Sequence, residues 1–223
     1  IWIWNPVGEL LDKIPVPDGK PINCTFGGAD MRDLFITGMG GLHVQKMRLT
    51  GIPAVIPAAY PENQKDRLAA PVPEGVTVHP DVSYASYGIR DMLADIYVPA
   101  GEGPYPAVVL IHGGGWFQGD KMKFRPMGLE LAKRGYVAMS ISYRLSHEAR
   151  FPANIQDCHA AVRFLRAEAA NYHVDPSRIG AVGGSAGAHL AGLLATSSKV
   201  EELHGDGGNP GVSSAIQLSL IHI

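Results

Sequence analysis

The chain has 223 residues, of which 46% are hydrophobic and 18% are charged, and its formal net charge is −2. This composition is typical of a globular protein, and the lack of a basic run disfavours nucleic acid as a partner. No apolar run reaches the roughly 18–20 residues that a membrane-spanning helix needs. Cys24 and Cys158 lie far apart and form neither a disulfide framework nor a metal-binding pattern, so we expect both to be buried apolar residues.

Residues 1–52 carry short apolar segments separated by turn residues, which predicts an all-β region. We expect strands at 1–4, 9–14, 22–26, 33–37 and 42–49. Short strands at regular spacing are typical of a propeller blade or of the edge of a sandwich.

Three segments of this region carry a family resemblance: WNPVGELL at 4–11, PINCTFGGAD at 21–30 and LFIT at 34–37. They resemble the C-terminal end of the SMP-30/gluconolactonase/lactonase propellers. The resemblance implies that residues 1–52 are a partial β-propeller. It also implies that the divalent metal of that family belongs to earlier blades, because none of its ligand positions maps onto residues 1–52. We interpret Asn23 and Asp30 as turn and strand-end residues.

Residues 53–80 contain six prolines and show no hydrophobic periodicity. Such a composition predicts a semi-extended linker, and we place the domain boundary there. After it, apolar strands alternate with helical patterns. We expect a half-buried antiparallel pair at 82–84 and 92–98, buried strands at 107–111, 136–141 and 179–182, and helices at 127–135, 154–169 and 188–195. This alternation predicts a parallel, doubly wound α/β sheet over residues 81–217.

The pentapeptide Gly183-Gly184-Ser185-Ala186-Gly187 matches G-x-S-x-G between a predicted strand and a predicted helix, the setting of a nucleophile elbow. Tiny residues are required around the serine because side chains would collide with the neighbouring strand and helix. By itself the pentapeptide is equally compatible with an ordinary Gly/Ser loop. The flanking strand and helix patterns favour the catalytic interpretation.

A second motif, His112-Gly113-Gly114-Gly115-Trp116, follows the strand that ends at Ile111. It matches the HGGG motif of lipases and esterases, whose backbone N–H groups bind the oxyanion of acyl transfer. A triglycine can also be a flexible loop. However, this one follows a strand at the sheet edge where ligands bind, and the elbow comes two strand–helix units later. The two motifs in this order favour an active site.

Seven segments now carry a second resemblance: 112–116, 142–145, 151–153, 156–157, 161–166, 175–180 and 183–190. Together they resemble the α/β-hydrolase carboxylesterases, with the hormone-sensitive-lipase-like and BD-FAE (bifunctional carbohydrate esterase) enzymes as the nearest group. The resemblance implies that Ser185 is the nucleophile and that the N–H groups of Gly114, Gly115 and Ala186 form the oxyanion hole. It implies no metal and no cofactor for the esterase. It also implies ester substrates such as acetylated or feruloylated plant polysaccharides, and export from the cytoplasm.

The family's triad order is Ser, then Asp or Glu, then His, so the acid and the base are expected well after Ser185. We find no residue for either role and expect the chain to be a C-terminally truncated α/β-hydrolase, inactive by itself. Asp157 is interpreted as a helix-start carboxylate favoured by the helix dipole. His112 and His189 are interpreted as structural residues. His204 lies too close behind the elbow in the sequence to be the triad base.

Several further residues near the motifs have more than one interpretation. Trp116 and Phe117 either line the acyl or alcohol pocket or simply pack. We expect Asp120 and Lys121 to hold the oxyanion loop, Tyr143-Arg144 to anchor a strand end, and residues 206–210 to be a connection.

Both ends of the sequence suggest a piece of a longer gene product. Residues 218–223 can be encoded by the end of a transposon that is commonly used to fragment DNA for sequencing, so we predict that they are adapter read-through. Two alternatives to a carbohydrate esterase stay open. One is sugar-lactone hydrolysis by the parent propeller, and the other is a non-catalytic carbohydrate-binding or interaction protein on a hydrolase scaffold. The sequence leaves the oligomeric state undetermined.

Overall fold

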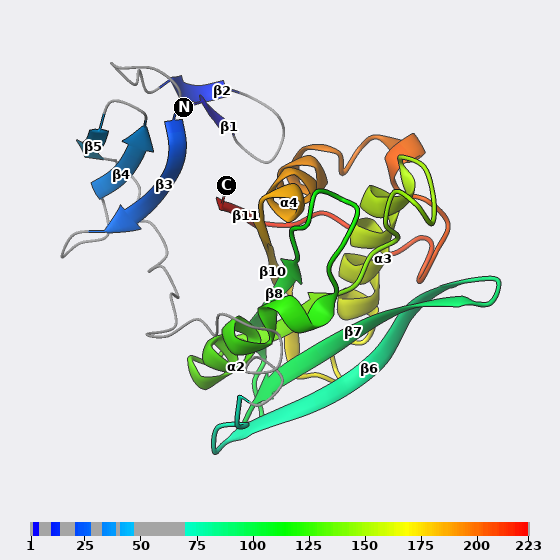
Figure 1. The fold of residues 1–223 in the computed structure, drawn as a ribbon. Coiled ribbons are helices and arrows are strands. Elements are labelled where there is room, and N and C mark those ends of the chain that lie inside the picture. Colours follow the sequence, from blue (N-terminus) through cyan, green and yellow to red (C-terminus); the bar gives the residue numbers. More distant parts are fainter. Residues whose placement is uncertain are drawn as a thin grey trace. The chain divides into compact units, whose positions relative to one another are not determined.

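The computed structural model describes residues 70–220 with their side chains. Elsewhere it describes the backbone of five strands between residues 2 and 46 and of residues 221–222. The chain divides into two compact units, residues 1–56 with 222–223, and residues 57–221 (Figure 1).

The N-terminal unit contains the five strands that the sequence predicts. They are β1 (Trp2–Trp4), β2 (Leu10–Lys13), β3 (Pro21–Gly27), β4 (Asp33–Gly38) and β5 (Gly41–Lys46). The first two form an antiparallel pair, and the other three form an antiparallel sheet in chain order. The predictions made for the side chains of Cys24, Asn23 and Asp30 lie outside the described residues.

The second unit is built on a six-stranded sheet in the order β11-β10-β8-β9-β7-β6. In chain order its strands are β6 (Val76–Tyr87), β7 (Arg90–Pro99), β8 (Tyr105–Ile111), β9 (Val137–Ile141), β10 (Val174–Gly184) and β11 (Leu218–His222). The three central strands β10, β8 and β9 are parallel, whereas β7 pairs antiparallel with both β9 and β6. This is the α/β architecture that the alternating pattern predicts.

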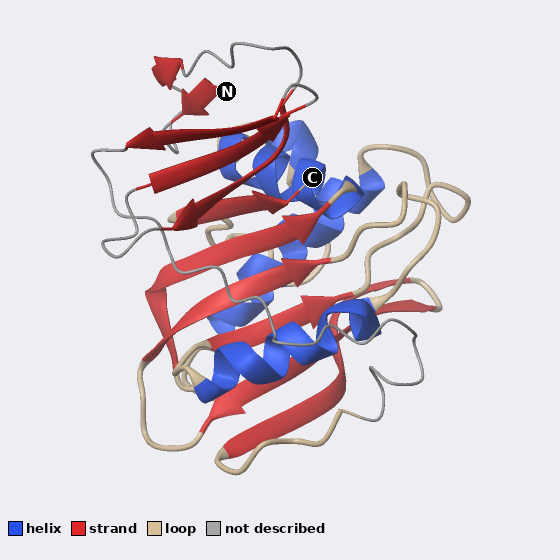
Figure 2. Ribbon diagram, turned by 60° about the vertical axis from the view of Figure 1, so that its left-hand side comes forward, coloured by secondary structure: helices blue, strands red, loops and turns tan. Residues whose placement is uncertain are grey.

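Helices lie on both faces of this sheet (Figure 2). They are η1 (Lys121–Phe124), α2 (Arg125–Lys133), α3 (Ala153–Ala167), α4 (Ala186–Thr196) and η2 (Glu201–Leu203). The chain steps from β8 to its neighbour β9 in one direction across the sheet, and then crosses back past β8 to β10 in the opposite direction. Because such crossovers are right-handed, α2 and α3 cover opposite faces. The carboxyl ends of β8 and β10 therefore form a topological switch point, where open α/β sheets bind ligands.

The core lies between the sheet and these helices. All five residues of β9 are buried, as expected for a strand that is covered on both faces. Cys158 is a free, fully buried thiol within this core, which confirms its interpretation as an apolar residue. None of the helices described between residues 70 and 220 is long and apolar enough to cross a membrane.

The expected linker is wrong at its C-terminal end, because β6 already begins at Val76. Pro80 favours the prediction of a linker here, since proline lacks the N–H that a central strand needs. In the structure β6 is an edge strand, and its pairing with β7 shifts register between His79 and Val82. A bulge on an edge strand tolerates proline. At the other sheet edge, β11 covers most of the segment predicted to be adapter read-through, and the origin of that segment stays a prediction.

A buried ion pair joins the end of β9 to α3. The Asp157 carboxylate accepts hydrogen bonds from the Arg144 backbone N–H at 2.7 Å and from its guanidinium Nη2 at 2.7 Å. The Asp157 side chain is fully buried, and the guanidinium lies 3.6 Å from the ring centroid of Tyr87. The interpretation of Asp157 as a helix-start carboxylate is therefore wrong, because its partner is a cation and not the N-terminus of α3. The expected anchoring role of Arg144 is confirmed.

Candidate active site

Ser185 joins β10 to α4 with an unusual backbone conformation. Its φ is 54° and its ψ is −117°, and its side chain is exposed. A side chain in this region costs about 1–3 kcal/mol, and such strain persists where the surrounding structure enforces it. The Ser185 carbonyl accepts the His189 N–H at 3.1 Å, so the first turn of α4 begins directly at the serine.

Two glycines explain how the surroundings enforce this turn. A Cβ on Gly183 would overlap the carbonyl oxygen of Gly187 and lie 2.6 Å from the amide nitrogen of Ala188. A Cβ on Gly187 would overlap the carbonyl oxygen of Ile111 and lie 2.6 Å from that of His112. The first turn of α4 therefore packs on the bare backbone of β10 and of the end of β8, as the pentapeptide predicts.

The same packing brings the triglycine loop beside the serine. A Cβ on Gly113 would lie 3.1 Å from the Cβ of Ser185. Gly114 has a φ of 137°, which only glycine adopts readily, and its carbonyl accepts the N–H groups of Phe117 and Gln118, both at 3.1 Å. The two motifs that lie 71 positions apart, at His112 and Gly183, thus meet at the switch point.

This arrangement offers backbone donors to an anion. The N-terminal N–H groups of an α-helix lack intrahelical partners, and no side chain caps α4. Ala186 is the first residue of that helix, and a Cβ on Gly115 would have no neighbour within 4 Å. A carbonyl oxygen that gains negative charge near Ser185 would therefore meet exposed N–H groups and a favourable helix dipole.

The Ser185 hydroxyl has no hydrogen-bond partner among the residues that the structure describes with side chains. His112 is buried, stacks on Tyr143 at 4.3 Å and contacts its own neighbour Gly113 through Nδ1. The ring of His189 meets that of Trp116 edge-on, at 5.5 Å between centroids. Both histidines therefore have the structural contacts expected of them.

A family model for BD-FAE matches residues 94–221, which is more than half of the chain. The chain belongs to the BD-FAE family. A second model, for the SMP-30/Gluconolactonase/LRE-like region, matches residues 1–40. The two resemblances read from the sequence are thus confirmed.

Curated relatives of this BD-FAE chain are esterases by name. Esterase LipQ of Mycobacterium tuberculosis is 34% identical over 139 residues, which cover 60% of this chain and 32% of LipQ. Carboxylesterase NlhH of the same species is 36% identical over 110 residues, which cover 48% of this chain and 34% of NlhH. The chain thus spans about a third of the length of these relatives.

Solved structures give the same fold. Esterase 2 of Thermogutta terrifontis with bound propionate has a TM-score of 0.56 and 34% identity, over 64% of this chain and 52% of the esterase. A bifunctional GH43-CE protein of Bacteroides eggerthii has a TM-score of 0.57 and 37% identity, over 62% of this chain and 21% of that protein. These likenesses establish an α/β-hydrolase fold for the BD-FAE chain.

Sequence reasoning found the two motifs and missed some of the residues that support them. Lys121 bridges Asp95 at 2.6 Å and Asp81 at 3.0 Å, and Asp120 caps η1 by accepting the Met122 N–H. These contacts hold the segment after the loop and not the loop itself, which differs from the expectation. Lys123, two positions further on, reaches the loop itself and gave no signal in the sequence. Trp116 and Phe117 remain partly exposed.

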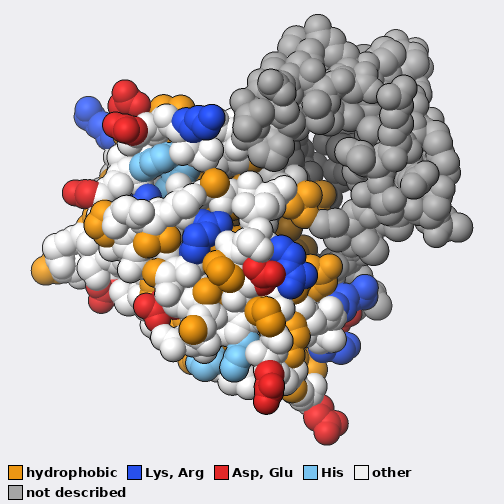
Figure 3. Space-filling view, turned by 180° about the vertical axis from the view of Figure 1, so that it is seen from behind, with side chains coloured by type: hydrophobic (Ala, Val, Ile, Leu, Met, Phe, Trp, Pro, Cys, Tyr) orange, Lys and Arg blue, Asp and Glu red, His pale blue; other side chains and the backbone are white. Residues whose placement is uncertain are grey.

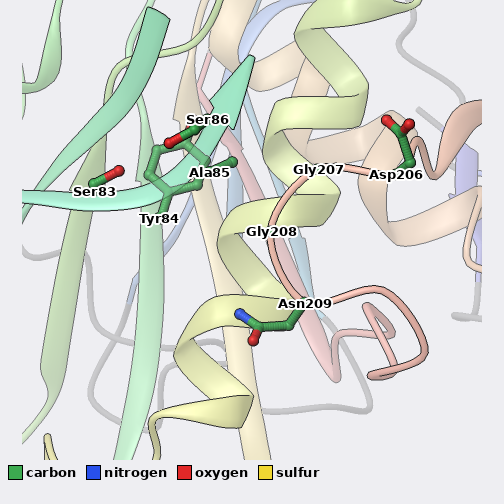
Figure 4. Close-up of a pocket in the computed structure, with 8 residues that line it drawn as sticks. All are labelled: Ser83, Tyr84, Ala85, Ser86, Asp206, Gly207, Gly208 and Asn209. Atoms are coloured by element: carbon green, nitrogen blue, oxygen red, sulfur yellow. The ribbon is translucent and has the colours of Figure 1, made fainter. Parts of the chain in front are cut away.

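A polar pocket of about 400 Å³ lies away from these motifs, between β6 and the connection at 206–209 (Figure 4). No predicted site residue lines it. On the face of the molecule seen in Figure 3, basic and acidic side chains are interspersed.

A buried histidine links this same connection to the helices. His159 on α3 contacts Ser214 Oγ through Nδ1 at 2.8 Å and Ser197 Oγ through Nε2 at 3.0 Å. Ser197 donates its only hydroxyl proton to the Leu193 carbonyl at 2.6 Å, so it accepts from Nε2. His159 is therefore the neutral Nε2–H tautomer, and Ser214 donates to Nδ1.

This tautomer makes the stability of the BD-FAE chain sensitive to acid. Burial, aided by His204 and Arg163, lowers the pKa of His159 to about 3, against about 6.5 in an unfolded chain. The unfolded state then binds more protons below pH 6.5, and stability falls by about 1.4 kcal/mol per pH unit from there towards pH 3. Between pH 6.5 and 5.0 we expect His159 to cost about 2 kcal/mol. Urea unfolding of the wild type and of His159→Gln at pH 6.5 and pH 5.0 measures this loss of stability. Equal pH slopes in the two proteins would contradict the assignment.

Proposed function

We propose that the protein that carries this chain is a serine carboxylesterase. Ser185 is the nucleophile, and the N–H groups of Gly114, Gly115 and Ala186 form the oxyanion hole. The observation that supports this most is the strained backbone of Ser185, which holds an exposed hydroxyl beside Gly113 and at the first turn of α4. Strain of this kind is retained at functional sites.

The proposed reaction follows from this placement. The Ser185 Oγ attacks the ester carbonyl carbon and loses its proton to a general base, and the carbonyl oxygen takes up the negative charge. Collapse of this intermediate breaks the bond between the carbonyl carbon and the alcohol oxygen. The alcohol leaves with the proton that the base had taken up, and an acyl-serine remains. Water then attacks the acyl-serine by the same route and releases the acid. Each N–H donor that meets the oxyanion lowers the barrier, by about 3–4 kcal/mol in comparable sites.

We assign the general base neither to His112 nor to His159. His112 directs Nδ1 to Gly113, and His159 uses both ring nitrogens on Ser197 and Ser214. The triad order of the family assigns the base to a histidine later in the gene product than Ser185. The activity is therefore a property to test in the complete gene product.

For the substrate we propose acyl esters of carbohydrates. The support is the BD-FAE family itself and the names of similar structures, one of which is a carbohydrate esterase from gut microbiota. The exposed rings of Trp116 and Phe117 offer apolar surface on the loop that follows β8. The esterase requires no cofactor in this proposal.

The test is covalent labelling by a fluorophosphonate, since a related esterase is phosphorylated by paraoxon. We expect the complete gene product to incorporate one equivalent of probe and the labelled peptide to contain Ser185. Ser185→Ala is expected to remove the label, whereas Ser198→Ala, at a partly exposed serine beyond α4, is expected to keep it. No labelling of the wild type, or equal labelling of Ser185→Ala, would overturn the nucleophile assignment.

A second candidate is sugar-lactone hydrolysis by the propeller, supported by the family match at residues 1–40. In that family a divalent metal would be held by other blades. Among the residues described with side chains, no cluster of His, Cys, Asp or Glu is suited to a metal ion, so we derive no step through one. Lactonase activity that is lost with a chelator but kept in Ser185→Ala would support this candidate over the esterase. Absence of both esterase and lactonase activity from the complete gene product would favour a non-catalytic protein.

A further inference from the structure

Lys123 extends from η1 to the triglycine loop. Its Nζ lies 3.1 Å from the carbonyl oxygen of Gly113, in a position that is only partly exposed. The same oxygen also faces His112 Nδ1 at 3.0 Å. Because His112 is buried and a carbonyl can only accept, Nδ1 carries the proton and donates to Gly113. The Gly113 carbonyl therefore meets two donors, and one of them is a cation.

These contacts act on an amide of the proposed oxyanion hole. The Gly113 carbonyl and the Gly114 N–H belong to one planar peptide unit and point in opposite directions. Holding the carbonyl towards Lys123 therefore fixes the direction of the Gly114 N–H. The loop needs such a restraint, because Gly114 and Gly115 adopt φ values of 137° and 61° and have no side chains to fix their orientation.

The two donors also change the strength of the Gly114 N–H. A hydrogen bond to the carbonyl polarises its peptide unit and makes the N–H a stronger donor, and a charged partner has the larger effect. This arrangement acts before any substrate arrives, so it requires no reorganisation when the oxyanion forms.

We propose that Lys123 is a positioning residue for the oxyanion hole, which orients and polarises the Gly113–Gly114 peptide so that the Gly114 N–H stabilises the transition state. The proposal rests on the esterase function proposed above. Lys121 performs a different task, because its ammonium pairs with Asp95 and Asp81 and not with the loop.

The kinetic test replaces Lys123 in the complete gene product, with p-nitrophenyl acetate as substrate. Removal of a whole oxyanion donor costs about 10²–10³-fold in kcat, and we expect Lys123→Met, which weakens one, to cost about tenfold with KM unchanged. Lys123→Arg, which keeps a charged donor, is expected to stay within threefold of the wild type. The matched control is Lys133→Met, an exposed lysine on α2 that pairs with Glu130. We expect it to change nothing.

A second measurement is independent of activity. In the 223-residue chain labelled with ¹⁵N-glycine, Lys123→Met is expected to move the Gly114 amide proton upfield and to leave that of Gly187 in place. If the wild type hydrolyses no ester, the proposed function fails while this shift still tests the role of Lys123. An unmoved Gly114 resonance in folded Lys123→Met, or a fall in kcat that Lys123→Arg does not rescue, overturns the proposal. If Lys123→Met does not fold, Lys123→Arg decides by the same two readouts.

Discussion

Replacing Ser185 by alanine is expected to lower kcat for ester hydrolysis by about 10⁶-fold in the complete gene product, as loss of a serine nucleophile does in other hydrolases. The remaining groups bind the substrate and stabilise an oxyanion, yet without the Oγ no acyl-serine forms. Hydrolysis of p-nitrophenyl acetate under single-turnover conditions measures the effect. A loss of less than about tenfold would contradict the assignment.

Stability is expected to respond differently, because Ser185 carries a strained φ of 54°. Alanine keeps the Cβ and therefore keeps the strain, whereas glycine adopts positive φ freely. We expect Ser185→Gly to be more stable than Ser185→Ala by about 1 kcal/mol, with both inactive. Urea unfolding of the 223-residue chain measures this difference. Equal stability of the two variants would show that the turn is not strained.

The second large effect is expected from Asp157→Ala, which we expect to destabilise the chain by about 3–5 kcal/mol. Asp157 is fully buried, and its removal leaves the largely buried Arg144 guanidinium without a counter-charge. The measurement is the free energy of unfolding in urea at pH 7. If Asp157→Ala has no larger effect than the control variant Glu130→Ala, the ion pair does not stabilise the fold.

Two further variants separate the ion pair from its burial. The control Glu130→Ala breaks exposed contacts with Lys133 and Arg134 and is expected to cost less than about 1 kcal/mol. The double variant Arg144→Met/Asp157→Leu is expected to recover most of the loss, because no charge is then buried alone.

The sequence predicts this fold well at positions where the structure accepts only one type of residue. A glycine that would overlap the backbone of a neighbour, such as Gly187, is visible in the sequence because no other residue fits there. The fully apolar β9 likewise predicts a strand covered on both faces. These features are local, so a single segment contains the whole signal.

The misassigned features depend on contacts between distant segments. Asp157 resembles a helix-start carboxylate until β9 brings Arg144 beside it. Lys123 gives no signal because lysines are common on helix surfaces, and only its reach to Gly113 reveals a role. Pro80 suggests a linker unless the strand is known to lie at the sheet edge.

The contact between Gly187 and the carbonyls of Ile111 and His112 is made by backbone atoms alone. The distance between the first turn of α4 and the end of β8 is therefore set by backbone atoms. In the proposed esterase, a substitution at an exposed loop position such as Phe117 can change which ester is recognised while this backbone contact stays constant. Selection for new substrates and preservation of the chemistry thus act on separate parts of the chain.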